Sequence, residues 1–413
     1  MIDFASVRIE PFRPIVALAF FAAGILPILP ILADGGTEAR WRNPGADRDP
    51  IALFNETMDR GAFILALEPT AGYLRSVLEY LRVPTESQIL VFSSASFQAK
   101  LIDQENPRAI YFNDDIAIAW VRGSLSIEAA ATDPGSGVAF YTLDQSAAGK
   151  PRFRREGSCL SCHQSQRTFG VPGLFVLSAS PDHEGGGLVS DHRTPLTERW
   201  GGWYVTGLSS GFRHLGNRTG QGWLQSLYDQ FDRSGYLADY SDIVALMIFE
   251  HQTQATNLIT RLAWEMRTGG SEQQLNDAVN TLVDYLLFVD ESPLPNRIIG
   301  TSGFRERFET LGPFDRRGRS LRQFDLHRRM MLYPCSYMIY SKAFIALPLA
   351  AKRLVYARMR DVLNGRSKEP RYARMSPSDR QAVLEILRDT KRDLPQYFGP
   401  VSAVEPRARI NRP

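Results

Sequence analysis

The sequence predicts an α+β fold that is mostly helical and has a small antiparallel sheet ahead of a cysteine-containing loop. Short runs rich in β-branched and aromatic residues, separated by turn residues, fill the stretch 89–143. Apolar residues at helical spacing dominate 222–395 instead. The loop lies between these two parts and carries the C-x-x-C-H pattern at 159–163.

The composition is that of a globular protein. The 413 residues are 44% hydrophobic and 23% charged, without a low-complexity tract, so the chain can bury a full core. The formal net charge is only +3. Because nucleic-acid-binding proteins carry a strong basic excess, we expect no nucleic-acid partner.

The N-terminus carries an uncharged stretch of nineteen residues, 14–32, which follows Arg8 and Arg13. A basic start followed by an apolar run predicts a secretory signal peptide or an uncleaved membrane anchor over 1–34. Either segment would direct the rest of the chain out of the cytoplasm. We therefore expect 35–413 to form a single domain in the periplasm.

The sequence leaves the choice between signal peptide and anchor open. Residues 31–33 form a poor cleavage site, which favours an anchor. Pro27 and Pro30 would kink a spanning helix, which favours a signal peptide. The protein is therefore predicted to be either soluble or associated with the inner membrane through its N-terminus.

Strands are expected in the part of the chain that surrounds the cysteine loop, 88–210. Turn residues at 113–115 and 133–137 separate the apolar runs. The predicted strands are 89–92, 109–112, 116–121, 138–141, 174–177 and 203–205. The apolar spacing of 41–83 predicts helices before them.

Helices are expected to fill the part after residue 222. Ser271 and Ser376 are typical N-caps, and Gly365 is a typical helix stop. The predicted helices are 222–233, 241–267, 271–289, 349–364 and 377–390. The stretch 293–322 is predicted to be irregular and 405–413 to be a frayed tail.

Cys159, Cys162 and His163 match the attachment pattern for a c-type haem. Two thiols three residues apart can form thioethers with the two vinyl groups on one edge of the porphyrin. The adjacent histidine can then coordinate the iron. On a helical turn the two cysteines lie on one face. We therefore expect one covalently bound haem c, with His163 as a metal ligand.

Two other uses of the pattern explain less of it. A structural zinc site would need two more ligands at matching spacing, but Cys335 is far along the chain, and His183 and His192 are nine residues apart. A redox dithiol would leave His163 idle, and no thioredoxin-like βαβ pattern surrounds the motif.

Cys335 has no intramolecular disulfide partner once the haem takes the other two thiols. It lies in the aromatic stretch 333–337. A buried, inert thiol is expected there, and a thiolate ligand to the iron is the alternative.

The group on the second side of the iron decides between electron transfer and an open site. His251 is the first candidate, because it lies in the middle of the apolar stripe of the predicted helix 241–267. Met247 lies one turn earlier on the same face. His192 and His214, in predicted loops, are further candidates, and an unfilled position is the remaining alternative.

The motif at 159–163 resembles that of c-type cytochromes. Together with the stretches 199–207 and 333–337, it makes the chain similar to a family of exported bacterial cytochrome-c-domain proteins of unassigned role. The resemblance extends over most of the chain after the N-terminal segment. It implies haem binding at Cys159, Cys162 and His163 and implies no reaction.

The chain departs from the class I cytochromes c in one respect. Those proteins carry a methionine some tens of residues after the motif, whereas the first methionine after His163 is Met247, 84 residues on. We therefore do not expect the fold of a simple class I cytochrome c.

Two functions fit these observations. The first is a periplasmic electron-transfer protein that exchanges electrons with a redox partner protein or a small-molecule donor or acceptor. The alternative is a mono-haem oxidoreductase of peroxidase type with an open distal site, in which His192 or His214 acts as acid or base. A haem-based sensor or assembly module is a third, weaker hypothesis. The length of the chain favours the enzyme, and the presence of a single C-x-x-C-H motif favours the electron-transfer protein.

Overall fold

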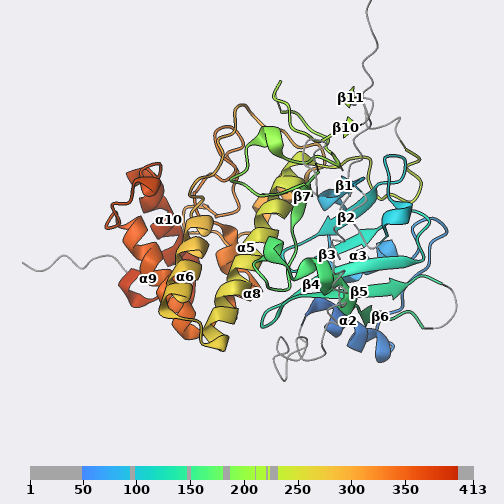
Figure 1. Ribbon diagram of the computed structural model, residues 1–413, viewed down its shortest axis with the longest axis horizontal. Helices are drawn as coiled ribbons and strands as arrows, with labels where there is room; N and C mark the ends of the chain where they lie inside the picture. The colour runs from blue at the N-terminus through green and yellow to red at the C-terminus, as the bar shows by residue number, and fades with distance from the viewer. Residues whose placement is uncertain are drawn as a thin grey trace, which may run out of the picture.

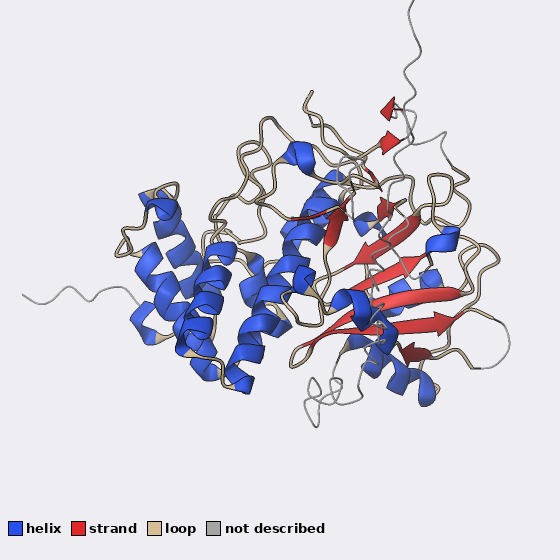
Figure 2. Cartoon of the chain, viewed as in Figure 1, coloured by secondary structure: helices blue, strands red, loops and turns tan. Residues whose placement is uncertain are grey.

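The computed structural model describes residues 49–93, 98–146, 150–179, 187–209, 211–219, 222–223 and 231–398. They form an α+β fold with more helix than strand, which confirms the predicted class. As expected, the fold is not that of a simple class I cytochrome c. Figures 1 and 2 show the sheet in one half of the molecule and most of the helices in the other.

The main sheet has seven strands, all antiparallel, in the order β6-β5-β4-β3-β2-β1-β9. Six of them follow one another along the chain, and β9 returns beside β1 (Figure 1). The strands are β1 (Ile89–Val91), β2 (Arg108–Phe112), β3 (Ile116–Trp120), β4 (Ser126–Asp133), β5 (Gly137–Asp144), β6 (Phe153–Arg155) and β9 (Trp203–Tyr204). Two-stranded ribbons join β7 (Val176–Ser178) to β8 (Leu188–Ser190) and β10 (Arg218–Thr219) to β11 (Gly222–Trp223).

The sheet buries both of its faces. Ala109 and Tyr111 belong to one core cluster, with α2 (Pro50–Asp59) and α3 (Leu74–Leu81), whereas Ile110 and Phe112 belong to a second cluster with α5 (Ile243–Thr268). This alternation follows from the two-residue period of a strand. Phe112 meets Phe249 of α5, with ring centroids 4.9 Å apart. The sheet is thus held between the N-terminal helices and the long central helix.

The helical half is built on α5. It packs against α6 (Glu272–Leu286), which packs against α9 (Leu349–Leu363), and α10 (Pro377–Thr390) follows (Figure 1). Short helices α7 (Phe304–Thr310) and α8 (Lys342–Ile345) also contact α5. Ser271 and Ser376 are N-caps as predicted, and Gly365 follows α9 with a positive φ of 68°.

Three predictions about the elements are corrected. Helix α5 begins at Ile243 rather than at residue 241, and its N-cap is Asp242, whose carboxylate accepts from two backbone amides. Helix α7 lies inside the stretch 293–322, which was predicted to be irregular. Residues 222–223, predicted to begin a helix, form strand β11.

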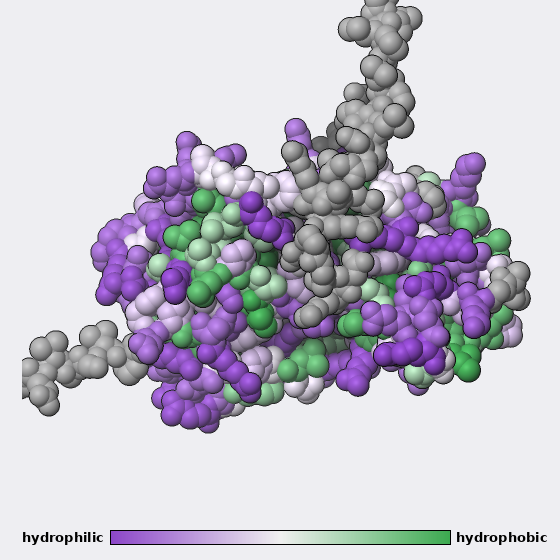
Figure 3. Space-filling view, turned by 90° about the horizontal axis from the view of Figure 1, so that it is seen from below, coloured by the Kyte–Doolittle hydropathy of each residue, from purple (hydrophilic) through white to green (hydrophobic). Residues whose placement is uncertain are grey.

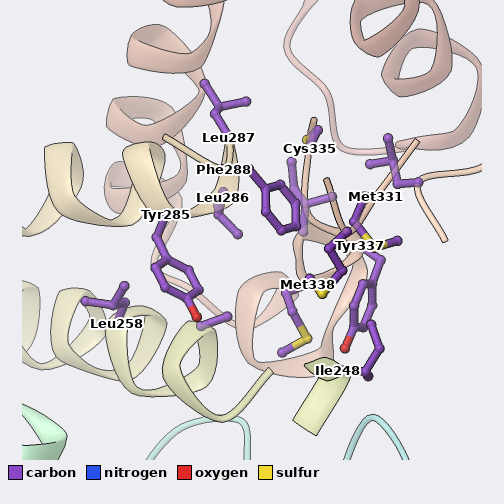
Figure 4. Packing of buried hydrophobic residues seen from close by; sticks show 14 of the residues in the cluster. Ile248, Leu258, Tyr285, Leu286, Leu287, Phe288, Met331, Cys335, Tyr337 and Met338 are labelled. Carbon is purple, nitrogen blue, oxygen red and sulfur yellow. The ribbon is translucent and has the colours of Figure 1, made fainter. Parts of the chain in front are cut away.

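Cys335 lies in the packed core of the helical half. Figure 4 shows it among Phe288, Met331 and other buried side chains. It is completely buried, and burial raises the pKa of its thiol to about 12. These observations fit the expected inert thiol. On the face drawn in Figure 3, hydrophobic side chains gather both over the helical half and at the opposite edge of the molecule, among mainly hydrophilic ones.

Several predictions fall on parts of the chain that lie outside the described residues. These are the signal peptide or anchor over 1–34, the loop residue His183, most of the predicted helix 222–233 and the tail 405–413. Among the helices of the described part, none is long and apolar enough to cross a membrane. The expectation of a single domain over 35–413 stays a prediction.

Candidate haem-attachment site

The C-x-x-C-H motif forms a compact turn at the end of the main sheet. A 3₁₀ turn, Gly157–Cys159, runs directly into the short helix α4 (Leu160–His163). The Glu156 carboxylate caps this turn by accepting from the backbone amide of Ser158 at 3.1 Å. After the motif, Ser165 and Thr168 form a capping box around a second 3₁₀ turn. The chain is therefore fixed on both sides of the motif by its own local hydrogen bonds.

Both motif cysteines are free thiols that solvent can reach. Cys159 is half-buried and Cys162 is exposed. They are three residues apart on a helical turn, which places their side chains on one face. Burial raises the pKa of Cys159 to about 11, so its sulfur is a protonated thiol at neutral pH. This spacing is the one that two thioether bonds to one porphyrin edge require.

His163 is oriented by a backbone carbonyl. Its Nδ1 donates to the carbonyl oxygen of Gly173 at 3.0 Å. The imidazole lies between Phe140 and Phe175, with ring centroids 4.8 and 5.2 Å away. Burial lowers its pKa to about 4, so the ring is neutral at pH 7. Since Nδ1 carries the proton, Nε2 has the lone pair, which is the arrangement of histidines that bind metal ions.

The segment that orients His163 is itself held by the central helix. Asn257 of α5 accepts from the amide of Leu174 at 3.2 Å and donates to its carbonyl at 2.7 Å. A Cβ at Gly173 would lie 2.0 Å from Asn257 Oδ1, so only glycine fits there. The chain of contacts from α5 to Leu174, Gly173 and His163 therefore fixes the direction of the imidazole.

His251, the predicted second metal ligand, lies in a different hydrogen-bond network. Its Nδ1 is 2.9 Å from Nδ1 of His192, and its Nε2 is 2.6 Å from Oγ of Ser336. His251 precedes Asn257 by six residues, which is about 9 Å along the helix axis and about 240° around it. The structure thus brings both ring nitrogens of His251 to protein partners, and its role as a second metal ligand stays a prediction.

A buried ion pair extends this network. Glu250, which is fully buried, accepts from Ser190 Oγ at 2.5 Å and lies 3.4 Å from Arg199 Nη1. Arg199 also donates to the carbonyl oxygens of Thr194 at 2.7 Å and His192 at 2.9 Å. Burial lowers the pKa of His192 well below its usual value and raises that of Glu250. We call Ser190, His192, Arg199, Glu250, His251 and Ser336 the buried polar network.

The remaining ligand candidates lie in packed surroundings. Met247 is a buried core residue of α5, and its exposed fraction is 2%. The ring of His214 packs edge-on against Trp200, with centroids 5.1 Å apart. In the described part of the chain, no group of three or more histidine, cysteine or acidic side chains is arranged to hold a metal ion.

Sequence reasoning found the motif but missed the residues that support it. Gly173 lies 10 residues after His163 and contacts it directly, whereas Asn257 acts through Leu174, from which it is 83 residues away. Glu250 precedes the predicted ligand His251, and a carboxylate within an apolar helix stripe is a signal that a buried cation lies opposite. That signal would have indicated that Arg199, or another arginine, forms an ion pair with Glu250.

Comparisons of this chain with family models, with curated proteins and with solved structures found no match in any of the three.

Proposed function

We propose that this protein is an exported c-type haem protein that transfers electrons. Cys159 and Cys162 would hold one haem through thioether bonds, and His163 Nε2 would be an iron ligand. The observation that carries this proposal is the hydrogen bond from His163 Nδ1 to the Gly173 carbonyl at 3.0 Å. That bond leaves an unprotonated Nε2 on the same turn as two free thiols.

The exposure of the motif supports electron transfer as the role. An iron in haem supplies one-electron redox chemistry. Cys162 is exposed, so the attached porphyrin edge would lie near the protein surface. A partner protein or a small-molecule donor or acceptor could reach that edge without a change in the fold. The proposed location is the periplasm, on the basis of the apolar segment 14–32.

One observation favours a second candidate function, a mono-haem oxidoreductase with an open distal site. Both ring nitrogens of His251 are engaged, by His192 at 2.9 Å and by Ser336 at 2.6 Å. With its first candidate ligand held in this way, the iron would keep a position for a small molecule unless another residue fills it.

Absorption spectra of the purified protein, oxidised and reduced, with and without carbon monoxide, test both candidates. An electron carrier is expected to give sharp low-spin bands on reduction that carbon monoxide does not move. A high-spin spectrum that shifts with carbon monoxide would support the open site instead. Absence of any haem bands in protein made by a host that attaches haem c would overturn both.

The role of His163 is tested by two matched histidine variants. We expect His163→Ala to change the spectrum of the reduced protein, because the iron loses its protein ligand. His327→Ala removes an exposed histidine and is expected to leave the spectrum unchanged. Identical spectra for both variants would contradict the assignment of His163.

A further inference from the structure

A cavity of about 240 Å³ lies between the sheet and helix α7, away from the motif turn. Its lining comes from the end of α3, the turn between β2 and β3, α5 and α7. The volume far exceeds the roughly 10–15 Å³ that one water molecule needs and approaches the roughly 300 Å³ of the smallest ligand pockets. No lining residue belongs to the stretch 157–175. The cavity is therefore a feature separate from the proposed haem site.

One side of the cavity is aromatic. Phe112 of β2 and Phe304 of α7 have ring centroids 5.6 Å apart, and Phe304 in turn lies 5.6 Å from Phe308. All three side chains are at most 4% exposed and are held by the surrounding core. Such a wall favours a flat apolar ring, which can stack or meet these rings edge-on.

The acidic side chains at the cavity are already paired. Asp114 accepts two hydrogen bonds from Arg322, the Nη1 bond being 3.2 Å long. Arg322 is fixed further by stacking on Phe308, its guanidinium carbon being 4.7 Å from the ring centroid. Asp115 lies 2.7 Å from Lys342 Nζ. The charges of both carboxylates are thus compensated by the protein itself.

The two arginines at the cavity are not compensated in this way. Arg82, at the end of α3, makes no ion pair with another residue of the described part. Among the described residues, Arg307 of α7 forms its ion pair with Glu86, at 3.9 Å, and both side chains are substantially exposed. At that distance the contact is longer than a charge-assisted hydrogen bond. The unbalanced charge facing the cavity is therefore positive.

We propose that this cavity binds a small organic anion with a single-ring apolar body, such as an aromatic carboxylate. The ring would contact Phe112, Phe304 and Phe308, and the anionic group would pair with Arg82 and Arg307. This function goes beyond electron transfer and does not depend on haem. It would give the protein a second, independent ligand site.

Titration of the full-length protein with benzoate, followed by ligand-observed NMR at pH 7, tests the proposal. Benzyl alcohol and benzylamine carry the same ring with a neutral and a cationic group. We expect saturable binding of benzoate and at least about tenfold weaker binding of both analogues, because only the anion can pair with the arginines. Equal or tighter binding of benzylamine would overturn the proposal.

Variants locate the site. Arg82→Gln and Arg307→Gln are each expected to weaken benzoate binding by about tenfold. Arg75→Gln is the matched control, since Arg75 lies on the same helix α3, pairs with Glu68 and does not line the cavity. Retained thermal unfolding temperatures would show that the variants fold. Unchanged benzoate binding in both cavity variants, or an equal loss in Arg75→Gln, would contradict the assignment.

Discussion

The motif turn and the buried polar network use histidine in opposite ways. His163 lies on the motif turn, where its Nδ1 donates to a backbone carbonyl and its Nε2 is the proposed iron ligand. His251 lies on the buried helix α5, and its two ring nitrogens form hydrogen bonds with His192 and Ser336. The first arrangement suits binding of a metal, and the second suits the satisfaction of polar groups within a core.

This difference teaches that two buried or half-buried histidines can differ in how far the protein itself satisfies their ring nitrogens. What separates the two residues is the number of ring nitrogens that the protein itself satisfies. The motif turn is also held mainly by local hydrogen bonds, whereas the network joins segments 51 to 85 residues apart. Changes in the first region should affect haem attachment, and changes in the second should affect stability.

The largest expected effect is on attachment. Cys159→Ala/Cys162→Ala is expected to abolish covalent haem, because no thioether can form. Extraction with acid acetone should then remove all haem from the variant and none from the wild type. Cys335→Ala, which changes a buried core thiol, is the control and should keep its covalent haem.

Loss of the buried carboxylate should give the largest change in stability. Glu250→Ala leaves Arg199 charged and buried without its acidic partner, at an expected cost of about 3–5 kcal/mol in the free energy of unfolding. Glu68→Ala, which breaks the exposed pair with Arg75, should cost less than about 1 kcal/mol. Urea unfolding measures both. A similar small cost for the two variants would show that the network does not stabilise the core.

The network should also make stability depend on pH through His251. Burial lowers its pKa to about 3, below the roughly 6.5 of an unfolded chain. The unfolded state therefore binds the proton first, and this contribution to stability is lost as the pH falls below about 6.5, by about 1.4 kcal/mol per pH unit.

The pH dependence of the whole protein does not report on His251 alone. Burial raises the pKa values of Glu250 and Glu291, and such groups stabilise the folded state as the pH falls. A variant is therefore needed to isolate the contribution of His251. Between pH 7 and pH 5, His251→Gln should lose about 2 kcal/mol less stability than the wild type. Urea unfolding at the two pH values measures the difference. Parallel losses in both proteins would contradict a neutral, buried His251.

The smallest expected effect belongs to the local bonds of the motif turn. Ser165→Ala removes one half of the capping box with Thr168 and should cost about 0.5–1 kcal/mol. Covalent haem should remain, since neither thiol moves out of reach. Measurement of haem content together with urea unfolding checks both parts. A loss of haem in this variant would mean that the turn depends on the cap for attachment.

Much of the fold was predictable from local patterns. The runs that became β1, β2, β3 and β5 are rich in strand-forming residues and bounded by turn residues. Strand β4 was missed because its centre is three alanines, which have weak strand propensity, and it forms by pairing with β3 and β5. Helix α7 was missed because it is only seven residues long and lacks a side-chain cap.

The site was predictable only where it is local. The positions of Cys159, Cys162 and His163 follow from spacing alone, but the orientation of His163 depends on Gly173 and Asn257, which no pattern links to it. Burial of His251 was also predictable from its helix stripe. Periodicity shows which face of a helix is buried, and it does not show which side chain arrives from another segment to satisfy that face.

The most direct test of the central claim is mass spectrometry of the protein made in a host that attaches haem c. The account predicts one added haem per chain, retained under denaturing conditions. After proteolysis this haem should be found on the peptide that contains Cys159 and Cys162. A chain of unmodified mass, or a haem attached to any other peptide, would contradict it.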